Sequence, residues 1–330
     1  MNTVRVVPES ELKDSIKLDL DAVGEIEKGF AKLDEGKATV PPIMMIPIPH
    51  LQAEVDIKAA YVEGLESLAV KVASGFFMNP RKGLPSQSGQ MLVIDAETGF
   101  LQAVLLDNGY LTQVRTGAAG AVAATHLAPS DARKVGVIGA GVQARFQMRA
   151  LSLIRDIETI RTFSLDDDEV RDAYAEDMTE ELGVRVIKAA SVEEVVAESS
   201  VVVTTTPSRK PFLRAEWLHP GLHITTMGSD TEEKQETHPD VAAAVNILAC
   251  DLKAQSFRLG ELRSARAAGT VTDASTVVEL GSIVRGNHPG RTDENQVTMC
   301  DLTGVGVQDT MIATRAYTIA KDRDLGTVIG

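Results

Sequence analysis

Cysteine is scarce in this sequence, and long apolar runs are missing. Only Cys250 and Cys300 occur, each in an apolar, strand-like stretch, so we expect two buried thiols and neither a disulfide nor a metal site. This usage is typical of a cytoplasmic protein. No apolar run approaches the roughly 18 residues that a membrane span needs, and residues 1–14 are too charged for a signal peptide. We therefore expect no membrane partner.

Basic residues are outnumbered by acidic ones. The 330 residues include 33 Lys and Arg against 47 Asp and Glu, a formal net charge of -14. This balance argues against nucleic acid as a partner, although a local basic site for an anionic metabolite stays open. The length and the 44% hydrophobic fraction predict roughly two globular domains with ample core material.

The most informative stretch begins at Lys134 and reads KVGVIGAGVQA. A short buried-strand pattern leads into Gly139, Gly141 and Ala144, the order G-x-G-x-x-A. In dinucleotide-binding folds the first glycine permits a tight turn, the second lets the pyrophosphate approach the backbone, and the third small residue lets the next helix pack closely. Glycines at this spacing also occur in plain strand-to-helix turns. The preceding strand and the helical pattern at 143–154 favour the cofactor site.

An acidic cluster, Asp166 to Asp168, follows the next predicted strand. We expect Asp166 to end that strand and to accept hydrogen bonds from the ribose hydroxyls of the cofactor. A carboxylate there would repel the 2′-phosphate of NADP, and Leu165 stands where an arginine would be needed for that phosphate. The predicted cofactor is therefore NAD. The cluster could also simply cap the next helix, with Asp168 as the capping residue.

The order of elements predicts an α/β fold. From Lys134 onward, short β-rich runs alternate with helical segments, which is typical of a doubly wound parallel Rossmann sheet. The first third of the chain instead shows mixed helix and antiparallel strands, an α+β pattern. A helical pattern at 308–322 follows the last predicted strand and could return to that first portion. We predict one domain of residues 1–116 with 308–330, and a second of residues 117–307.

Three charged residues stand out in or beside apolar strands. Lys58 and Lys71 each interrupt a strand-like run, and Asp230 follows a strand beside Gly228. Taken alone, each lysine is more typical of a polar strand face turned to solvent. Asp230 could act as a general acid or base near a nicotinamide, but Asp is also a common cap residue. The histidines show no pair or metal-ligand spacing, so no metal is predicted.

Several stretches resemble the ornithine cyclodeaminase and mu-crystallin family, over nearly the whole chain and in the family's order. They include LLDNGYLTQVRTGAAG, VGVIGAGVQA, MGSDTEEKQE and CDLTGVGVQD. The pattern is most similar to the branch of ectoine-utilisation proteins and iminosuccinate reductase. The resemblance implies a homodimer built through a substrate-binding, non-nucleotide domain. It also implies bound NAD(P) and chemistry at the amine or imine carbon of small amino acids.

The resemblance also implies roles for individual residues. Lys71 matches a lysine next to the substrate carboxylate, Arg115 an arginine between substrate and cofactor, and Asp230 the catalytic carboxylate. This context favours functional roles for Lys71 and Asp230 over the solvent-facing and capping interpretations. With the glycine turn and Asp166 included, the positions expected to contact the cofactor are Ser86, Arg115, Thr116, Gly139, Gly141, Val142, Gln143, Asp166, Thr205, Met227, Lys234 and Leu302.

Two departures from the family pattern bear on the substrate. The segment Pro42-Ile43-Met44 lacks the arginine that many members use as a carboxylate clamp, and Lys58 stands where many have an apolar or acidic group. Lys58 and Lys71 are thirteen residues apart on predicted neighbouring strands, so both could face one pocket. With Arg115 they would surround a small substrate with three cations, which is costly unless the substrate carries matching negative charge. We expect a dicarboxylate.

The leading hypothesis is an NADH-dependent imine reductase that converts iminosuccinate, or a close dicarboxylic imino acid, to L-aspartate. Arg115 and Lys71 would hold the α-carboxylate, Lys58 the distal one, and Asp230 the proton on the substrate nitrogen. One alternative is an ornithine-type cyclodeaminase with internally recycled NAD, whose substrate ammonium Lys58 would repel. A second is a non-catalytic ligand-binding protein of the mu-crystallin kind.

Overall fold

The computed structural model describes residues 3–330, with position 80 described for its backbone alone. The chain divides into two compact units. Unit one takes the chain up to Arg115 together with Val305–Gly330, and unit two is Thr116–Gly304. Among the described helices, none combines the length and the apolar character needed to cross a membrane.

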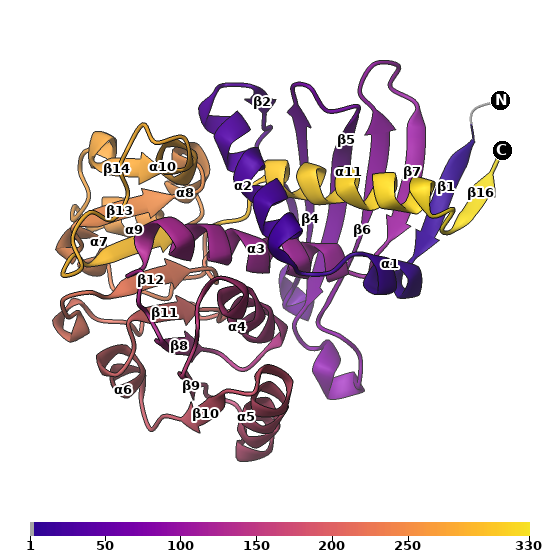
Figure 1. The fold of residues 1–330 in the computed structure, drawn as a ribbon. Helices are drawn as coiled ribbons and strands as arrows, with labels where there is room; N and C mark the ends of the chain where they lie inside the picture. The colour runs from indigo at the N-terminus through magenta and orange to yellow at the C-terminus, as the bar shows by residue number, and fades with distance from the viewer. Residues whose placement is uncertain (1–2) are drawn as a thin grey trace. The chain divides into compact units, whose positions relative to one another are not determined.

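Unit one is built on a mixed sheet (Figure 1). Its strands lie in the order β16-β1-β7-β6-β5-β4-β2, and β3 pairs with β4. Strands β4 to β7 are antiparallel neighbours, whereas β1 runs parallel to β7. The elements are β1 (Val4–Pro8), α1 (Glu9–Ser15), α2 (Leu20–Asp34), β2 (Ala38–Thr39), β3 (Met44–Ile48), η1 (Pro49–Leu51), β4 (Ala53–Val62), β5 (Ser67–Phe76), η2 (Asn79–Lys82), β6 (Gln87–Asp95), β7 (Leu101–Leu106), α11 (Gly306–Asp322) and β16 (Thr327–Ile329).

Helix α11 lies across one face of this sheet, and α2 packs on α11 (Figure 1). The helix can approach closely because its first residue is glycine: a Cβ at Gly306 would lie 2.3 Å from the carbonyl oxygen of Ala59 in β4. Similarly, a Cβ at Gly29 of α2 would lie 2.8 Å from Cγ of Met311. Small residues at these two positions therefore set the spacing of the layers.

Unit two contains the parallel sheet that the alternating pattern predicts, in the order β10-β9-β8-β11-β12-β15-β13-β14 (Figure 1). All neighbouring strands in it are parallel. The strands are β8 (Lys134–Ile138), β9 (Thr159–Phe163), β10 (Arg185–Lys188), β11 (Val201–Thr204), β12 (His223–Thr226), β13 (Ile247–Cys250), β14 (Val277–Glu279) and β15 (Thr298–Asp301). The other elements are α3 (Tyr110–Leu127, from Thr116 onward), α4 (Val142–Ile154), α5 (Asp168–Leu182), α6 (Val192–Ala197), η3 (Ala215–Trp217), α7 (Val241–Ala244), α8 (Lys253–Ser256), α9 (Glu261–Ala267), η4 (Ala274–Thr276) and α10 (Leu280–Val284).

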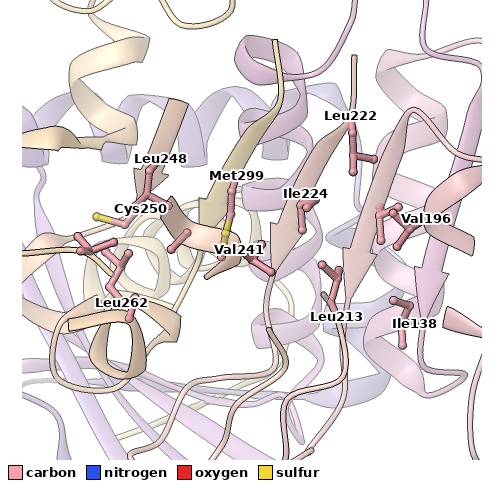
Figure 2. Packing of buried hydrophobic residues seen from close by; sticks show 14 of the residues in the cluster. Ile138, Val196, Leu213, Leu222, Ile224, Val241, Leu248, Cys250, Leu262 and Met299 are labelled. Atoms are coloured by element: carbon pink, nitrogen blue, oxygen red, sulfur yellow. The ribbon is translucent and has the colours of Figure 1, made fainter. Parts of the chain in front are cut away.

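Both faces of this sheet are buried, which explains its nearly continuous apolar strands. Figure 2 shows a core cluster that includes Ile224 of β12 and Met299 of β15. Val202 of β11 belongs to the same cluster. Val201 and Val203 point to a second cluster on the opposite face. A doubly wound sheet with helices on both faces follows from this arrangement, and the predicted fold class is confirmed. Cys250 and Cys300 are buried free thiols, also as predicted.

Several local expectations were wrong. The short strands β1, β14 and β16 were not predicted. The run of small residues after Arg115 predicts a helix that starts there, but α3 begins earlier, at Tyr110, because the Asp107 carboxylate accepts a hydrogen bond from the backbone N–H of Leu111 and so caps an earlier first turn. Strand β9 ends at Phe163, which leaves Asp166 in the following loop.

The predicted cap of α5 was also wrong. Asp167 is the N-cap residue of that helix, and Asp168 is its first helical residue, where it pairs with Arg171.

Candidate functional site

The two lysines of unit one face the same side of the sheet. Lys58 in β4 and Lys71 in β5 are direct cross-strand partners, and such partners project from the same face of a sheet. That face is the one covered by α11, since the Lys71 Nζ atom lies 2.9 Å from Oδ1 of Asp309 in that helix. Lys58 is 6% exposed and Lys71 2%. The expected pairing is therefore present, with both side chains buried and neither turned to solvent.

Arg115 joins these lysines through α11. Its Nε lies 3.0 Å from the same Asp309 Oδ1 atom, and its Nη1 donates to Oε1 of Gln308 at 3.0 Å. The same Gln308 oxygen accepts a hydrogen bond from the backbone N–H of Val305, which caps the start of α11. Lys71, Arg115 and Asp309 are thereby brought together from three elements distant in the sequence.

The charges in this cluster shift one another's proton affinity. Burial, together with the positive charges of Arg115 and Lys58, lowers the pKa of Lys71 to about 7 against the opposing effect of Asp309. For Asp309 burial acts to raise the pKa, but Arg115, Lys71 and Lys58 outweigh it and hold the pKa below its usual value. Asp309 is thus an anion at neutral pH, whereas Lys71 can gain or lose a proton there.

Two buried carboxylates of this cluster were missed by the sequence reasoning. Asp309 is fully buried, and its Oδ2 atom has no hydrogen-bond partner among the residues that the structure describes. Asp107, 1% exposed, feels the charge of Lys71, and burial raises its pKa to about 6. A signal for Asp309 did exist: the polar run Gln308-Asp309-Thr310 interrupts an otherwise apolar helix start. Counting Lys58, the cluster holds three cationic and two acidic side chains.

The glycine turn of unit two has the geometry that a dinucleotide requires. Gly139 follows β8 with a φ of +119°, a conformation that disfavours side chains, and a Cβ there would lie 2.6 Å from Oγ1 of Thr205. Gly141 is the N-cap of α4, makes no side-chain cap, and would have nothing within 4 Å of an added Cβ. The first N–H groups of α4 therefore face open space, where a pyrophosphate can approach them. The residues present fit NAD.

Other predicted cofactor positions gather at the carboxyl ends of the parallel strands, where doubly wound folds bind their ligands. Val142 and Gln143 form the first turn of α4, and Oε1 of Gln143 is buried without a hydrogen-bond partner. Thr205 and Met227 directly follow β11 and β12, and Leu302 directly follows β15.

The loop after β9 carries the residues that are predicted to select the cofactor. Leu165 is 94% exposed, and Asp166 beside it is also exposed. No basic side chain occupies either position, so this loop presents a carboxylate where NADP would need a cation. The loop thus suits NAD.

Asp230 and Lys234 lie in the segment after β12. Lys234 Nζ donates to Oδ1 of Asp230 at 2.7 Å, and the Asp230 side chain is 37% exposed. A half-exposed carboxylate held beside an ammonium suits a group that exchanges protons with a ligand.

Two predicted cofactor residues, Ser86 and Thr116, accept hydrogen bonds within their own units. The Ser86 carbonyl accepts a hydrogen bond from the Phe76 N–H and closes the β5–β6 hairpin. The Thr116 carbonyl accepts one from the side chain of Gln147 in α4. Lys58, Lys71, Ser86 and Arg115 belong to unit one, whereas Asp230 and the remaining cofactor positions belong to unit two.

Comparison with known proteins assigns the chain to a family. The model of the ornithine cyclodeaminase/mu-crystallin family matches residues 3–324. The chain belongs to this family. Among its members, an uncharacterized cyclodeaminase of Sinorhizobium fredii is 44% identical and covers 99% of both chains. An iminosuccinate reductase of Paracoccus denitrificans is 35% identical over 90% of this chain and 91% of its own.

A solved structure of the same family extends the comparison. An archaeal alanine dehydrogenase dimer with bound NAD has a TM-score of 0.91 and 29% identity, and the match covers 99% of each chain. The family resemblance inferred from the sequence blocks is therefore confirmed, and it extends to both units.

The glycine turn generates a test of cofactor binding. Changing Gly141→Ala should weaken NADH binding by at least about tenfold, because the methyl group would occupy the space above the N–H groups of α4. The melting temperature should stay unchanged, since that methyl group meets no protein atom. NADH fluorescence titration and thermal unfolding measure the two effects.

Gly139→Ala is the matched control. It should lower the melting temperature, because φ at this position is +119° and the added Cβ would clash with Thr205. Unaltered NADH affinity in Gly141→Ala would contradict the assigned pyrophosphate position.

Proposed function

We propose that this protein is an imine reductase that reduces iminosuccinate, or a close dicarboxylic imino acid, to L-aspartate. At the coarser level, the chain is an NAD-dependent oxidoreductase that acts on CH–NH2 or C=N groups, like the alanine dehydrogenase and the iminosuccinate reductase of its family. The observation that carries the finer proposal is the shared face of Lys58 and Lys71, next to Arg115. Three cations beside two acids leave the cluster with a net positive charge, which suits an anionic ligand.

Each residue has a defined task in this reaction. NADH supplies the hydride to the imine carbon, and one proton is consumed at the substrate nitrogen. Lys71 and Arg115 bind the α-carboxylate, oriented by their shared partner Asp309. Lys58 binds the distal carboxylate. Asp230 exchanges the proton with the substrate nitrogen, and Lys234 donates a hydrogen bond to the Asp230 carboxylate. Unit one would thus serve the substrate and unit two the cofactor.

The alternative is a cyclodeaminase, which the name of the relative from Sinorhizobium fredii favours. Such a substrate carries a distal ammonium, and a positive charge at Lys58 would repel it. Initial-rate assays with iminosuccinate, generated from oxaloacetate and ammonia, and with ornithine decide between the two. The proposal would be refuted if the protein cyclised ornithine but did not oxidise NADH in the presence of iminosuccinate.

The Lys58→Met variant tests the dicarboxylate specificity. Removing the charge should raise KM for iminosuccinate by about 30-fold, equivalent to about 2 kcal/mol for a lost buried ion pair. KM for a monocarboxylic imine such as pyrroline-2-carboxylate, and the affinity for NADH, should change less than about twofold. Lys58→Arg keeps the charge and serves as the control. An unchanged KM for iminosuccinate in Lys58→Met would remove the basis for a distal-carboxylate site.

Lys71 generates a pH prediction. Its pKa is lowered to about 7, so its positive charge is lost as the pH rises through that value. The inhibition constant of succinate, an inert dicarboxylate, should therefore increase by up to about tenfold per pH unit above about pH 7. In Lys71→Arg the guanidinium stays charged, so this increase should disappear. The same pH dependence in both proteins would show that another group titrates.

We also propose that the protein forms a homodimer through unit one. On the sheet face opposite α11, apolar side chains are exposed, including Met44 at 60% and Ile46 at 49%. Their cross-strand partners Ile57 and Val55 extend this apolar surface into β4. The archaeal relative is itself a dimer.

Ile46→Lys tests the dimer, because a charge in the apolar face would oppose association. Sedimentation should show a dimer for the wild type and a shift toward monomer for the variant. The matched control is Val170→Lys, at an exposed position in α5 of unit two, which should leave the dimer intact. A monomeric wild type would overturn the dimer proposal.

A further inference from the structure

Two buried glutamates hold the segment that carries Asp230 and Lys234. This segment runs from Met227, directly after β12, to Thr237. Glu236 lies within it and is fully buried, and Glu261, the first residue of α9, is 1% exposed. Neither residue belongs to the set that the sequence singled out.

The Glu236 carboxylate joins the loops after two adjacent strands. Its Oε1 atom accepts hydrogen bonds from the backbone N–H of Thr206 at 2.6 Å and from the Thr206 hydroxyl at 2.8 Å. Its Oε2 atom accepts from the Thr204 hydroxyl at 2.5 Å and from the backbone N–H of Gly228 at 2.8 Å. Thr205 and Met227, both predicted cofactor positions, are the immediate neighbours of these donors.

The packing around Glu236 leaves no space for a side chain at position 228. A Cβ there would lie 2.1 Å from the Thr206 carbonyl oxygen and 2.5 Å from Cδ of Glu236. The two loops are therefore pressed together at the point from which the segment with Asp230 departs.

Glu261 accepts hydrogen bonds from both ends of the same segment. Its Oε1 atom accepts from the Ser229 hydroxyl and, at 2.7 Å, from the backbone N–H of Glu236. Its Oε2 atom accepts from the backbone N–H and the hydroxyl of Thr237, at 3.1 and 2.7 Å. Asp230 and Lys234 lie between the two fixed ends.

The donor pattern demands carboxylates at both positions. Each of the four oxygens accepts one backbone N–H and one hydroxyl. A glutamine would place its NH2 group against a backbone N–H whichever way its amide turned, leaving two donors facing each other. Burial, with the charge of Glu261 as the next cause, raises the pKa of Glu236 to about 7, so this arrangement carries a cost. A core that served stability alone could use apolar side chains here.

We propose that Glu236 and Glu261 are positioning residues that fix Asp230 and Lys234 relative to the loops at Thr205 and Met227. The inference rests on the proposed function in that it takes Asp230 as the group that handles the substrate proton. It does not depend on which imine is the substrate.

The test is Glu236→Gln, with Glu279→Gln as the matched control. Glu279 also accepts a backbone N–H, from Lys253, but lies at the end of β14, in no contact assigned to the site. Glu236→Gln should lower kcat by at least about tenfold and change KM for the imine by less than about twofold. The stoichiometry of NADH binding, followed by fluorescence, should stay intact. Glu279→Gln should leave these values unchanged.

A double variant separates positioning from general stability. If Glu236 acts through Asp230, then Glu236→Gln should lower kcat little further in an Asp230→Asn background. The proposal would be overturned if the losses in kcat of the two single variants multiplied in the double variant. It would also be overturned if Glu236→Gln lowered the melting temperature but kept full kcat per NADH-binding site. Should Glu236→Gln not fold, Thr204→Val removes one donor hydroxyl with little change of shape. It should lower kcat by at least about threefold, and an unchanged kcat would count against the proposal.

The assay uses iminosuccinate and, in parallel, pyrroline-2-carboxylate and alanine with NAD. If the wild type turns over one of the latter but not iminosuccinate, the proposed substrate fails while the positioning inference is still tested on the active substrate. If Glu236→Gln retains full kcat on an active substrate, the positioning inference fails and the substrate assignment stands.

Discussion

The buried contact between Lys71 and Asp309 is the interaction on which unit one depends. It joins the middle of the sheet to α11, a helix that the chain reaches only after completing unit two. Removing Asp309 would leave Lys71 and Arg115 buried without their shared counterion, at a cost of about 3–5 kcal/mol. The same Asp309 oxygen contacts Arg115, and Asp309 opposes the lowering of the Lys71 pKa that burial causes. Docking of the helix and assembly of this charged cluster are therefore one event.

Unit two differs from unit one in the polar groups that it offers to a ligand. Its site has to receive a cofactor pyrophosphate, and it offers backbone N–H groups at the start of α4 for that purpose. Elsewhere in the unit, buried carboxylates such as Glu236 use N–H groups and hydroxyls to fix loops at the strand ends. The buried cluster of unit one consists of charged side chains, whereas unit two offers mainly oriented backbone dipoles.

Local sequence patterns were sufficient for the parts that depend on local physics. The alternation of strands and helices predicted the parallel sheet, and the glycine spacing predicted the tight turn at Gly139. The strand periodicity even placed Lys58 and Lys71 on neighbouring strands. Asp309 was missed because it lies 238 residues from Lys71, and only the fold brings the two together. The short strands β1, β14 and β16 were missed because they are held by their neighbours in the sheet, which a three- to five-residue pattern does not reveal.

Unit one is formed from two segments that are separated in the sequence by unit two, and this affects the folding of the nascent chain. Unit two is synthesised entirely before Val305–Gly330, so its sheet can close while unit one still lacks α11 and β16. During that interval Lys71 and Arg115 have no Asp309 beside them, and the sheet face destined for α11 stays open to water. The counterion that Lys71 and Arg115 share is thus synthesised last, and their cluster cannot assemble before translation has passed Asp309.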